Sequence, residues 1–175
     1  MSELQKLYGG SIYAFIPPGA VDISKMRQVP DSQEVFAHAS TDQSIIFDIL
    51  EYLDEADEEA CRTHFNEIAG DSEAKIKKVD KLGLSPINCE AVYYLNGEHY
   101  MSKFRETAKN LVEVHMAIFR FKDLKTDILI TFNDPILINP ESSSAQESNN
   151  NDKWTTEQFL KTIETFYVAD FSLFG

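Results

Sequence analysis

Two neighbouring segments with alternating apolar residues restrict this chain to a fold built around a β-sheet. Residues 111–121 and 127–132 each carry apolar side chains at every second position, so that one face of each strand is apolar. These side chains are Val112, Val114, Met116 and Ile118 in the first segment, and Ile128, Ile130 and Phe132 in the second. A short turn at 123–125 joins the segments, which predicts an antiparallel pair.

Other segments are predicted to extend this sheet. They are 11–16, 34–38 and 74–86 as single strands, and 91–100 as a β-hairpin. The hairpin is predicted because Asn96-Gly97 is the preferred residue pair for a two-residue type I′ turn.

Two helices are predicted in the first half of the chain. Residues 41–53 place apolar side chains on one stripe at 3.6-residue spacing, so Asp48 and Glu51 share the outward face of this predicted helix. A second helical segment, 58–68, ends at Gly70.

The C-terminal part is predicted to contain a mobile loop and a final helix. Residues 139–153 are polar and low in complexity, which indicates a mobile loop. The helix begins at Thr155, where Thr155 and Gln158 form a capping box. We therefore expect an α+β fold with about six, mostly antiparallel strands and helices on both faces, in a single domain spanning residues 1–175.

The negative charge of the chain is concentrated in one segment. Between Asp31 and Glu73 there are 13 acidic residues and one basic residue, and the formal net charge of the whole chain is -13. An acidic face predicts a basic protein partner and argues against nucleic acid and anionic membrane, which would repel it. No apolar stretch approaches the ~18 residues that a membrane span requires.

Signatures of catalysis and of cofactor binding are missing. The sequence has no P-loop, GxGxxG, HExxH or GxSxG motif, so we predict neither an enzyme nor a cofactor. Cys61 and His64 have the spacing of metal ligands on a helix, and Cys89 is a further donor. A closed zinc site needs four ligands. A packed thiol and a partly exposed histidine are therefore the simpler interpretation, and we predict no metal.

Carboxylates around the first predicted helix have two interpretations. Asp48 and Glu51 can form an acid–base pair, or they can simply belong to a solvated helix face. Asp31 and Glu34 flank the start of the preceding strand, and Asp42 lies at the start of the helix. We therefore expect all five carboxylates to form one continuous acidic patch.

Several motifs resemble a known protein family. The motifs are Leu7-Tyr-Gly-Gly10, Pro17-Pro-Gly-Ala-Val-Asp22, Arg27-Gln-Val-Pro-Asp-Ser-Gln-Glu-Val35, Thr41-Asp-Gln-Ser-Ile-Ile46, Thr126-Asp-Ile-Leu-Ile-Thr-Phe-Asn133 and Asp170-Phe-Ser-Leu-Phe-Gly175. Together they resemble the Mog family of Ran-binding nuclear-import proteins, also called Ran guanine nucleotide release factors. The resemblance spans nearly the whole chain and is strongest over residues 7–53.

The resemblance implies a fold, a partner and an activity. The fold would be a six-stranded antiparallel sheet flanked by helices, and the partner would be the small GTPase Ran. The activity would be release of Ran's guanine nucleotide, mainly GTP, in support of nuclear protein import. The residues implied to contact Ran are Asp22, Asp31, Glu34, Asp48 and Glu51, with Arg27, Gln33 and Asp42 as further candidates. We expect a monomer that is present in nucleus and cytoplasm.

Two other functions fit parts of the sequence. One is an acidic adaptor that binds another basic protein without promoting exchange. The other is a small-ligand-binding sheet domain that uses Tyr93, Tyr94, His99 and Tyr100. A deep pocket with a perturbed carboxylate or histidine would favour the second.

Overall fold

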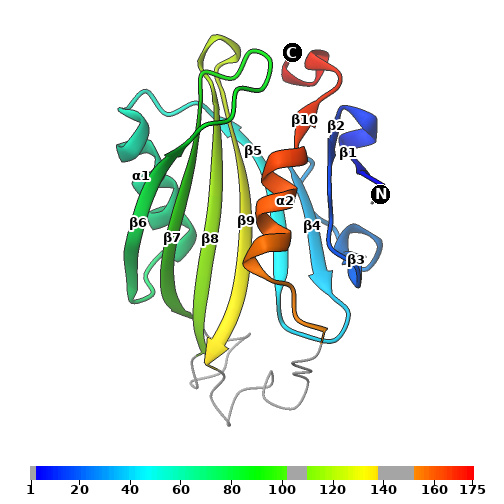
Figure 1. Ribbon diagram of the computed structural model, residues 1–175, viewed down its shortest axis with the longest axis vertical. Coiled ribbons are helices and arrows are strands. Elements are labelled where there is room, and N and C mark those ends of the chain that lie inside the picture. The colour runs from blue at the N-terminus through cyan, green and yellow to red at the C-terminus, as the bar shows by residue number, and fades with distance from the viewer. Residues whose placement is uncertain (1–2, 102–109, 138–151) are drawn as a thin grey trace.

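A seven-stranded antiparallel sheet organises the molecule, with strand order β3-β4-β5-β9-β8-β7-β6 (Figure 1). Its strands are β3 (Ala20–Asp22), β4 (Gln33–His38), β5 (Ser44–Glu51), β6 (Ala74–Leu82), β7 (Ala91–Met101), β8 (Asn110–Phe121) and β9 (Thr126–Leu137). A second sheet has the order β1-β2-β10 and consists of β1 (Gln5–Leu7), β2 (Ile12–Ala14) and β10 (Tyr167–Val168). This computed structural model describes residues 3–101, 110–137 and 152–175. The predicted mobile loop 139–153 lies almost entirely outside the described residues.

Strands β8 and β9 form the antiparallel pair that the sequence predicts. The register places Phe119 opposite Ile128 and His115 opposite Phe132. A 3₁₀ turn (Lys122–Leu124) joins the strands, and Lys125 closes it in a left-handed conformation with φ of 52°. The two predicted apolar faces belong to two separate cores, one on each side of the sheet.

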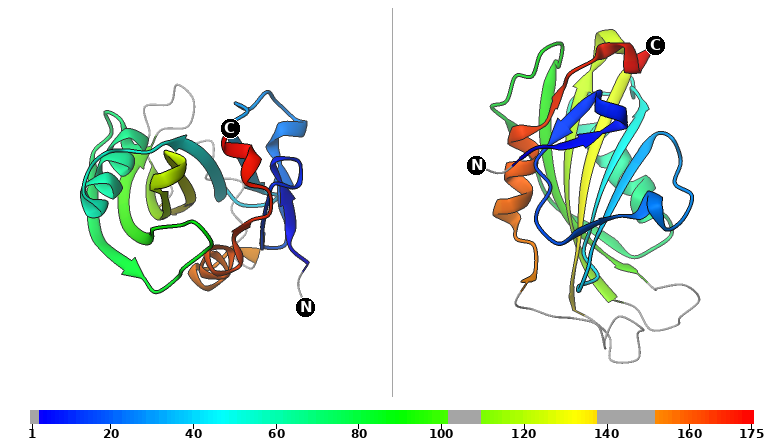
Figure 2. Two further views of the ribbon diagram at one scale, coloured as in Figure 1. Left: turned by 90° about the horizontal axis from the view of Figure 1, so that it is seen from above. Right: turned by 90° about the vertical axis from the view of Figure 1, so that its right-hand side faces the viewer.

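Each side of the sheet is covered by one helix (Figure 2). On one side, α1 (Asp57–Ala69) packs Cys61 and Phe65 against the core that contains Val114 and Met116. The helix ends at Gly70 as predicted. On the other side, α2 (Thr156–Thr165) packs Phe159 and Ile163 against the second core. The predicted α+β fold with helices on both faces is therefore confirmed, and the described residues form ten strands where about six were predicted. In the described part of the chain, neither helix is long and apolar enough to cross a membrane.

The capping box of α2 is present as predicted. The Thr155 hydroxyl oxygen accepts a hydrogen bond from the Gln158 backbone N–H at 3.2 Å, and Gln158 Oε1 accepts one from the Thr155 N–H at 2.8 Å. Trp154 and Phe159 on either side of this cap both pack against Phe132. These local contacts fix where the helix begins.

The prediction of a helix over residues 41–53 is wrong, because residues 44–51 form the central strand β5. Ile45 and Phe47 are fully buried on one face of the strand, which is the alternation of a sheet. β5 pairs with β4 on one edge and with β9 on the other, so its backbone hydrogen bonds are satisfied by distant parts of the chain. These non-local pairings override the helical spacing of the isoleucines.

The predicted hairpin at Asn96-Gly97 is also wrong, because β7 continues straight through it. The Asn96 side chain donates hydrogen bonds to Glu113 Oε1 and to the Val114 carbonyl oxygen, which keeps it in the sheet. A Cβ added at Gly97 would lie 2.8 Å from the Lys75 carbonyl oxygen and 2.9 Å from the Phe65 ring. Glycine is needed here for close packing of α1 on the sheet, and no turn is involved.

Gly97→Ala is expected to lower the free energy of unfolding by about 1–3 kcal/mol, because the added methyl group overpacks the contact with Phe65. Urea unfolding measures this change. Gly83→Ala is the matched control, since a Cβ at Gly83 would meet nothing within 4 Å. Equal midpoints for the two variants would contradict the packing role of Gly97.

Candidate functional site

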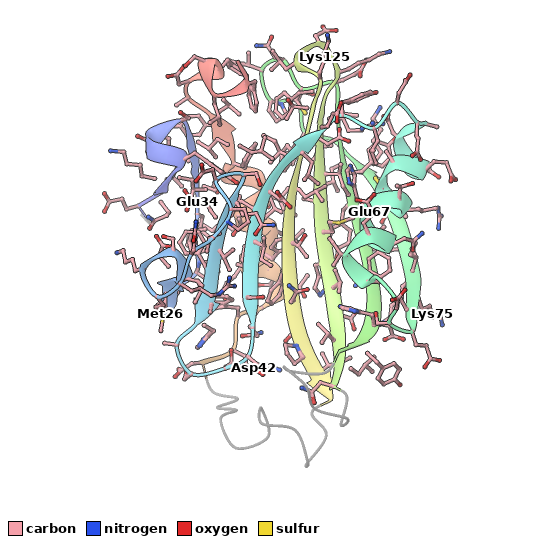
Figure 3. All side chains as sticks on the ribbon, turned by 180° about the vertical axis from the view of Figure 1, so that it is seen from behind. Met26, Glu34, Asp42, Glu67, Lys75 and Lys125 are labelled. Atoms are coloured by element: carbon pink, nitrogen blue, oxygen red, sulfur yellow. The ribbon has the colours of Figure 1, made fainter. Side chains whose placement is uncertain are left out.

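Asp48 lies on a part of the sheet that no helix covers. Seen from behind, α1 lies over β6 and β7 and leaves β5 and β9 open (Figure 3). Asp48 is opposite Leu129 in the register, and Leu129 belongs to the core on the α1 side. On this open face β5 presents Ile46, Asp48 and Leu50, all of them half-buried. The sheet therefore displays one carboxylate between two apolar side chains.

The Asp48 carboxylate is only partly satisfied by the protein. Its Oδ2 accepts a hydrogen bond from Gln33 Nε2 at 3.2 Å, and Gln33 is its direct neighbour across β4 and β5. Its Oδ1 is buried and has no hydrogen-bond partner among the described residues. Burial raises the pKa of Asp48, although hydrogen bonds from Gln33 and Ser32 and the nearby His64 act in the opposite direction. A half-buried carboxylate on an open sheet face is suited to pair with a cation of a partner protein.

Glu34 occupies the opposite face of the sheet. It is paired with Phe47, and its Oε1 accepts a hydrogen bond from the Tyr8 backbone N–H at 2.7 Å. The Tyr8 hydroxyl donates to the carbonyl oxygens of Ser32 at 2.8 Å and Phe47 at 3.2 Å. Burial raises the pKa of Glu34, and the negative charge of Asp22 adds to this, while the bond from Tyr8 opposes it. Glu34 thus attaches the N-terminal segment to β4.

Tyr8 is a residue whose role the sequence analysis missed. It has a φ of 49°, which is an unusual conformation for a residue with a side chain. Its three hydrogen bonds to β4, β5 and the segment before β4 hold it there. Its position in the Leu7-Tyr-Gly-Gly10 motif was the available signal.

The remaining predicted residues lie at different places around the β3–β5 edge of the sheet. Asp22 accepts hydrogen bonds from the backbone N–H and the hydroxyl of Ser24, so it caps the 3₁₀ turn Ile23–Lys25. Arg27 and Asp31 are exposed on the segment between this turn and β4.

The prediction that these carboxylates form one continuous patch is wrong, because Glu34 faces the other side of the sheet from Asp48 and two further carboxylates lie elsewhere. Asp42 lies in the turn between β4 and β5, at the other end of this hairpin from Glu34 (Figure 3). Glu51 is exposed at the end of β5, and three residues along a strand place it on the face opposite to Asp48. The shared face of Asp48 and Glu51 depended on the helix that does not form.

A buried ion pair lies beneath the segment that follows β5. Arg120 on β8 and Asp127 on β9 are directly opposite each other, both side chains are 0% exposed, and Arg120 Nε lies 3.1 Å from Asp127 Oδ1. Asp127 Oδ2 also lies 2.9 Å from His64 Nε2 on α1. Two charged residues flanking the turn at 123–125, within strongly apolar strands, were the signal for this pair, which the sequence analysis did not use.

His64 and the cysteines do not come together as a metal site. His64 is engaged with Asp127, and the described residues contain no group of three or more side chains placed to hold a metal ion. Burial raises the pKa of Cys61 to about 12 and that of Cys89 to about 11, so both remain thiols at neutral pH.

The tyrosine-rich segment does not form one surface either. Tyr93 and Tyr94 point to opposite sides of β7 and are buried in different cores. Tyr94 is hydrogen-bonded to His115. A groove of about 320 Å³ instead lies between the loop at 84–87 and the end of α2, and its lining includes Leu84, Ile163 and Phe166. None of Tyr93, Tyr94, His99 and Tyr100 lines that groove.

Comparisons with known proteins agree on one family. Residues 5–135 match the family described as Ran-interacting Mog1 protein. The Ran guanine nucleotide release factor of Danio rerio is 42% identical over 97% of this chain and 98% of its own length. That of Bos taurus is 35% identical over 97% of this chain and 95% of its own length.

The fold leads to the same family. The crystal structure of the Saccharomyces cerevisiae Ran-binding protein Mog1p matches with a TM-score of 0.74 and 25% sequence identity, covering 100% of this chain and 99% of the yeast chain. The match therefore includes the β5 strand and the open face that carries Asp48. By sequence and by fold, this chain belongs to the Mog1 family.

Proposed function

We propose that this protein binds the small GTPase Ran and promotes release of its guanine nucleotide, mainly GTP, in support of nuclear protein import. Its membership of a Ran-interacting family supports this function, as do relatives named Ran guanine nucleotide release factor. The observation that carries the proposal is Asp48, a half-buried carboxylate on an open sheet face with an unpartnered Oδ1. The protein acts as a regulator and contributes no catalytic group.

The mechanism follows from differential binding. A GTPase holds its nucleotide through a phosphate-binding loop, a lysine and a magnesium ion. A protein that binds the nucleotide-free form more tightly than the loaded form must favour release, because the two equilibria are linked. Carboxylates suit this task, since they pair with basic groups that the phosphates otherwise engage.

We assign the candidate residues to two roles. Asp48 is the central contact, with Gln33 holding its Oδ2, and Ile46 and Leu50 adding apolar area beside it. The exposed Asp31 and Arg27 contribute further contacts, and Glu51 contributes only from the end of β5, on the opposite face. Asp22 and Glu34 act by holding the neighbouring backbone in place. Asp42, at the other end of the hairpin, is not expected to contribute.

The net charge of the protein bears on the kind of partner that it can bind. A chain with a formal net charge of -13 will be attracted to a basic protein surface and repelled by nucleic acid and anionic lipid. We propose that it works as a monomer in both nucleus and cytoplasm.

Nucleotide release tests the function directly. The protein is expected to accelerate loss of a fluorescent GTP analogue from Ran, and this acceleration should weaken at higher salt because exposed charges are screened. Release that is unchanged while binding persists would favour the acidic adaptor. Absence of both release and binding would exclude Ran as the partner.

Asp48→Asn tests the central contact. We expect it to weaken Ran binding about tenfold or more, because a desolvated cation in the complex would lose its partner. Glu67→Gln removes one charge from an exposed position on α1, labelled in Figure 3, and should bind like the parent. Binding by isothermal titration calorimetry measures both, and equal affinities for parent and Asp48→Asn would contradict the assignment.

The same variant has an expected effect on stability with pH. The pKa of Asp48 is raised in the folded state, so folding binds protons and the free energy of unfolding falls as pH rises through this pKa. Asp48→Asn should therefore be more stable than the parent at pH 7. Below ~4, where the carboxyl group is protonated even in the unfolded chain, this advantage should disappear. Urea unfolding at pH 3 and pH 7 measures the difference, and a constant difference would argue against a desolvated carboxylate.

A further inference from the structure

The segment between β5 and α1 carries an unusual density of negative charge. We call residues 52–56 the acidic connector. Six carboxylates occupy positions 51–59, and they belong to Glu51, Asp54, Glu55, Asp57, Glu58 and Glu59. Like charges so close together repel one another and favour an extended, mobile chain. Contacts with other parts of the chain must therefore give the connector a fixed shape, and one of them is the hydrogen bond that the Thr63 hydroxyl donates to Glu55 Oε2 at 2.9 Å.

Arg120 holds the acidic connector from below. Its Nη1 donates hydrogen bonds to the Glu55 carbonyl oxygen and to Asp57 Oδ1, both at 2.9 Å, and its Nη2 donates to the Leu53 carbonyl oxygen. The Tyr52 ring covers the guanidinium group, with its centroid 4.1 Å from Cζ. One fully buried cation thus binds the connector at both ends and at the first residue of α1.

The neighbouring turn completes this attachment. Asp127, the ion-pair partner of Arg120, accepts a hydrogen bond from the Leu53 backbone N–H at 3.2 Å. The Lys125 carbonyl oxygen accepts one from the Tyr52 N–H at 3.0 Å, and Lys125 marks this end of the sheet in Figure 3. The planar guanidinium group is required here. Its fixed N–H directions reach two backbone carbonyl oxygens and two carboxylates at once, which the single ammonium group of a lysine cannot do.

We propose that Arg120 is a positioning residue for Ran binding. It fixes the acidic connector, which follows β5 directly, and through it the place of Asp54 and Glu55 relative to the open face that carries Asp48. This role rests on the proposed function above and adds to it a buried residue that never touches Ran. Ordering the connector before Ran arrives removes an entropic cost from binding, so the complex lives longer.

Arg120→Lys separates positioning from charge. The substitution keeps the net charge of the chain, so long-range attraction and the association rate should stay unchanged. Loss of the fork should raise the dissociation rate about tenfold, because the connector must now be ordered within the complex. Stopped-flow kinetics with nucleotide-free Ran measures both rates. Arg62→Lys on α1 makes the same chemical change away from the connector, and should leave both rates unchanged.

Asp57→Asn is a milder variant that still tests the proposal if Arg120→Lys does not fold. Asp57→Asn weakens the Nη1 contact at a side chain that is 34% exposed. Glu58→Gln removes the same charge one residue further along, on an exposed side chain. We expect faster dissociation for Asp57→Asn than for Glu58→Gln, with equal association rates. Hydrogen exchange of the Leu53 amide should also be faster in Arg120→Lys and Asp57→Asn.

The outcomes distinguish the two proposals. If the parent binds Ran and the folded variants dissociate at the parental rate, the positioning role of Arg120 is overturned and the proposed function stands. If the parent does not bind Ran, the proposed function fails, and the role of Arg120 in Ran binding fails with it. Faster dissociation together with faster exchange at Leu53 supports the proposal.

Discussion

The ion pair between Arg120 and Asp127 connects nearly every part of the α1 side of this protein. It bridges β8 and β9 at the centre of the sheet, receives His64 from α1, and holds the backbone that follows β5. Removing one partner from a buried pair is far more costly than exposing an ordinary surface charge, because an unpaired ion would remain in a dry interior. These contacts make it a fixed point for α1 and for the acidic connector.

A second anchoring point operates on the other side of the sheet. Glu34 and Tyr8 link the N-terminal segment to β4 and β5, and this link uses a carboxylate and a tyrosine whose pKa values are both raised by burial. Glu34 and Asp48 are thus two carboxylates whose burial disfavours the charged form. Such placement lowers stability at neutral pH, and it is expected where a surface must recognise a charged partner.

The parts of the fold that the sequence predicted correctly are those governed by local signals. The β8–β9 pair follows from alternation and a short turn, and the start of α2 follows from its capping box. The two errors arose where distant contacts decide. The isoleucines of β5 satisfy both a helical and an alternating period, and only the pairing with β4 and β9 resolves the ambiguity. Gly97 is explained by Phe65, which lies more than thirty residues away in the sequence.

The candidate site shows the same division. The motif resemblance identified Asp48 as a candidate contact. The face that Asp48 occupies, however, depends on residues 44–51 forming a strand. The helical spacing therefore could not predict that Asp48 and Glu51 lie on opposite faces. Arg120 lies four residues before the centre of the predicted turn at 123–125 and Asp127 three residues after it, so hairpin pairing would have brought them close together. Their contacts with the connector, however, involve backbone carbonyl groups that carry no sequence signal.

The small sheet β1-β2-β10 sets an order of events for synthesis. β2 pairs Ile12 and Tyr13 with Val168 and Tyr167, so these strands are completed by residues that are made much later in synthesis. While the chain emerges from the ribosome, residues 5–14 therefore lack one of their neighbours, and the segment bearing Tyr8 is held only by its links to β4 and β5. This edge can therefore close only after residues 167–168 have been made and have left the ribosome, which places its closure late in folding.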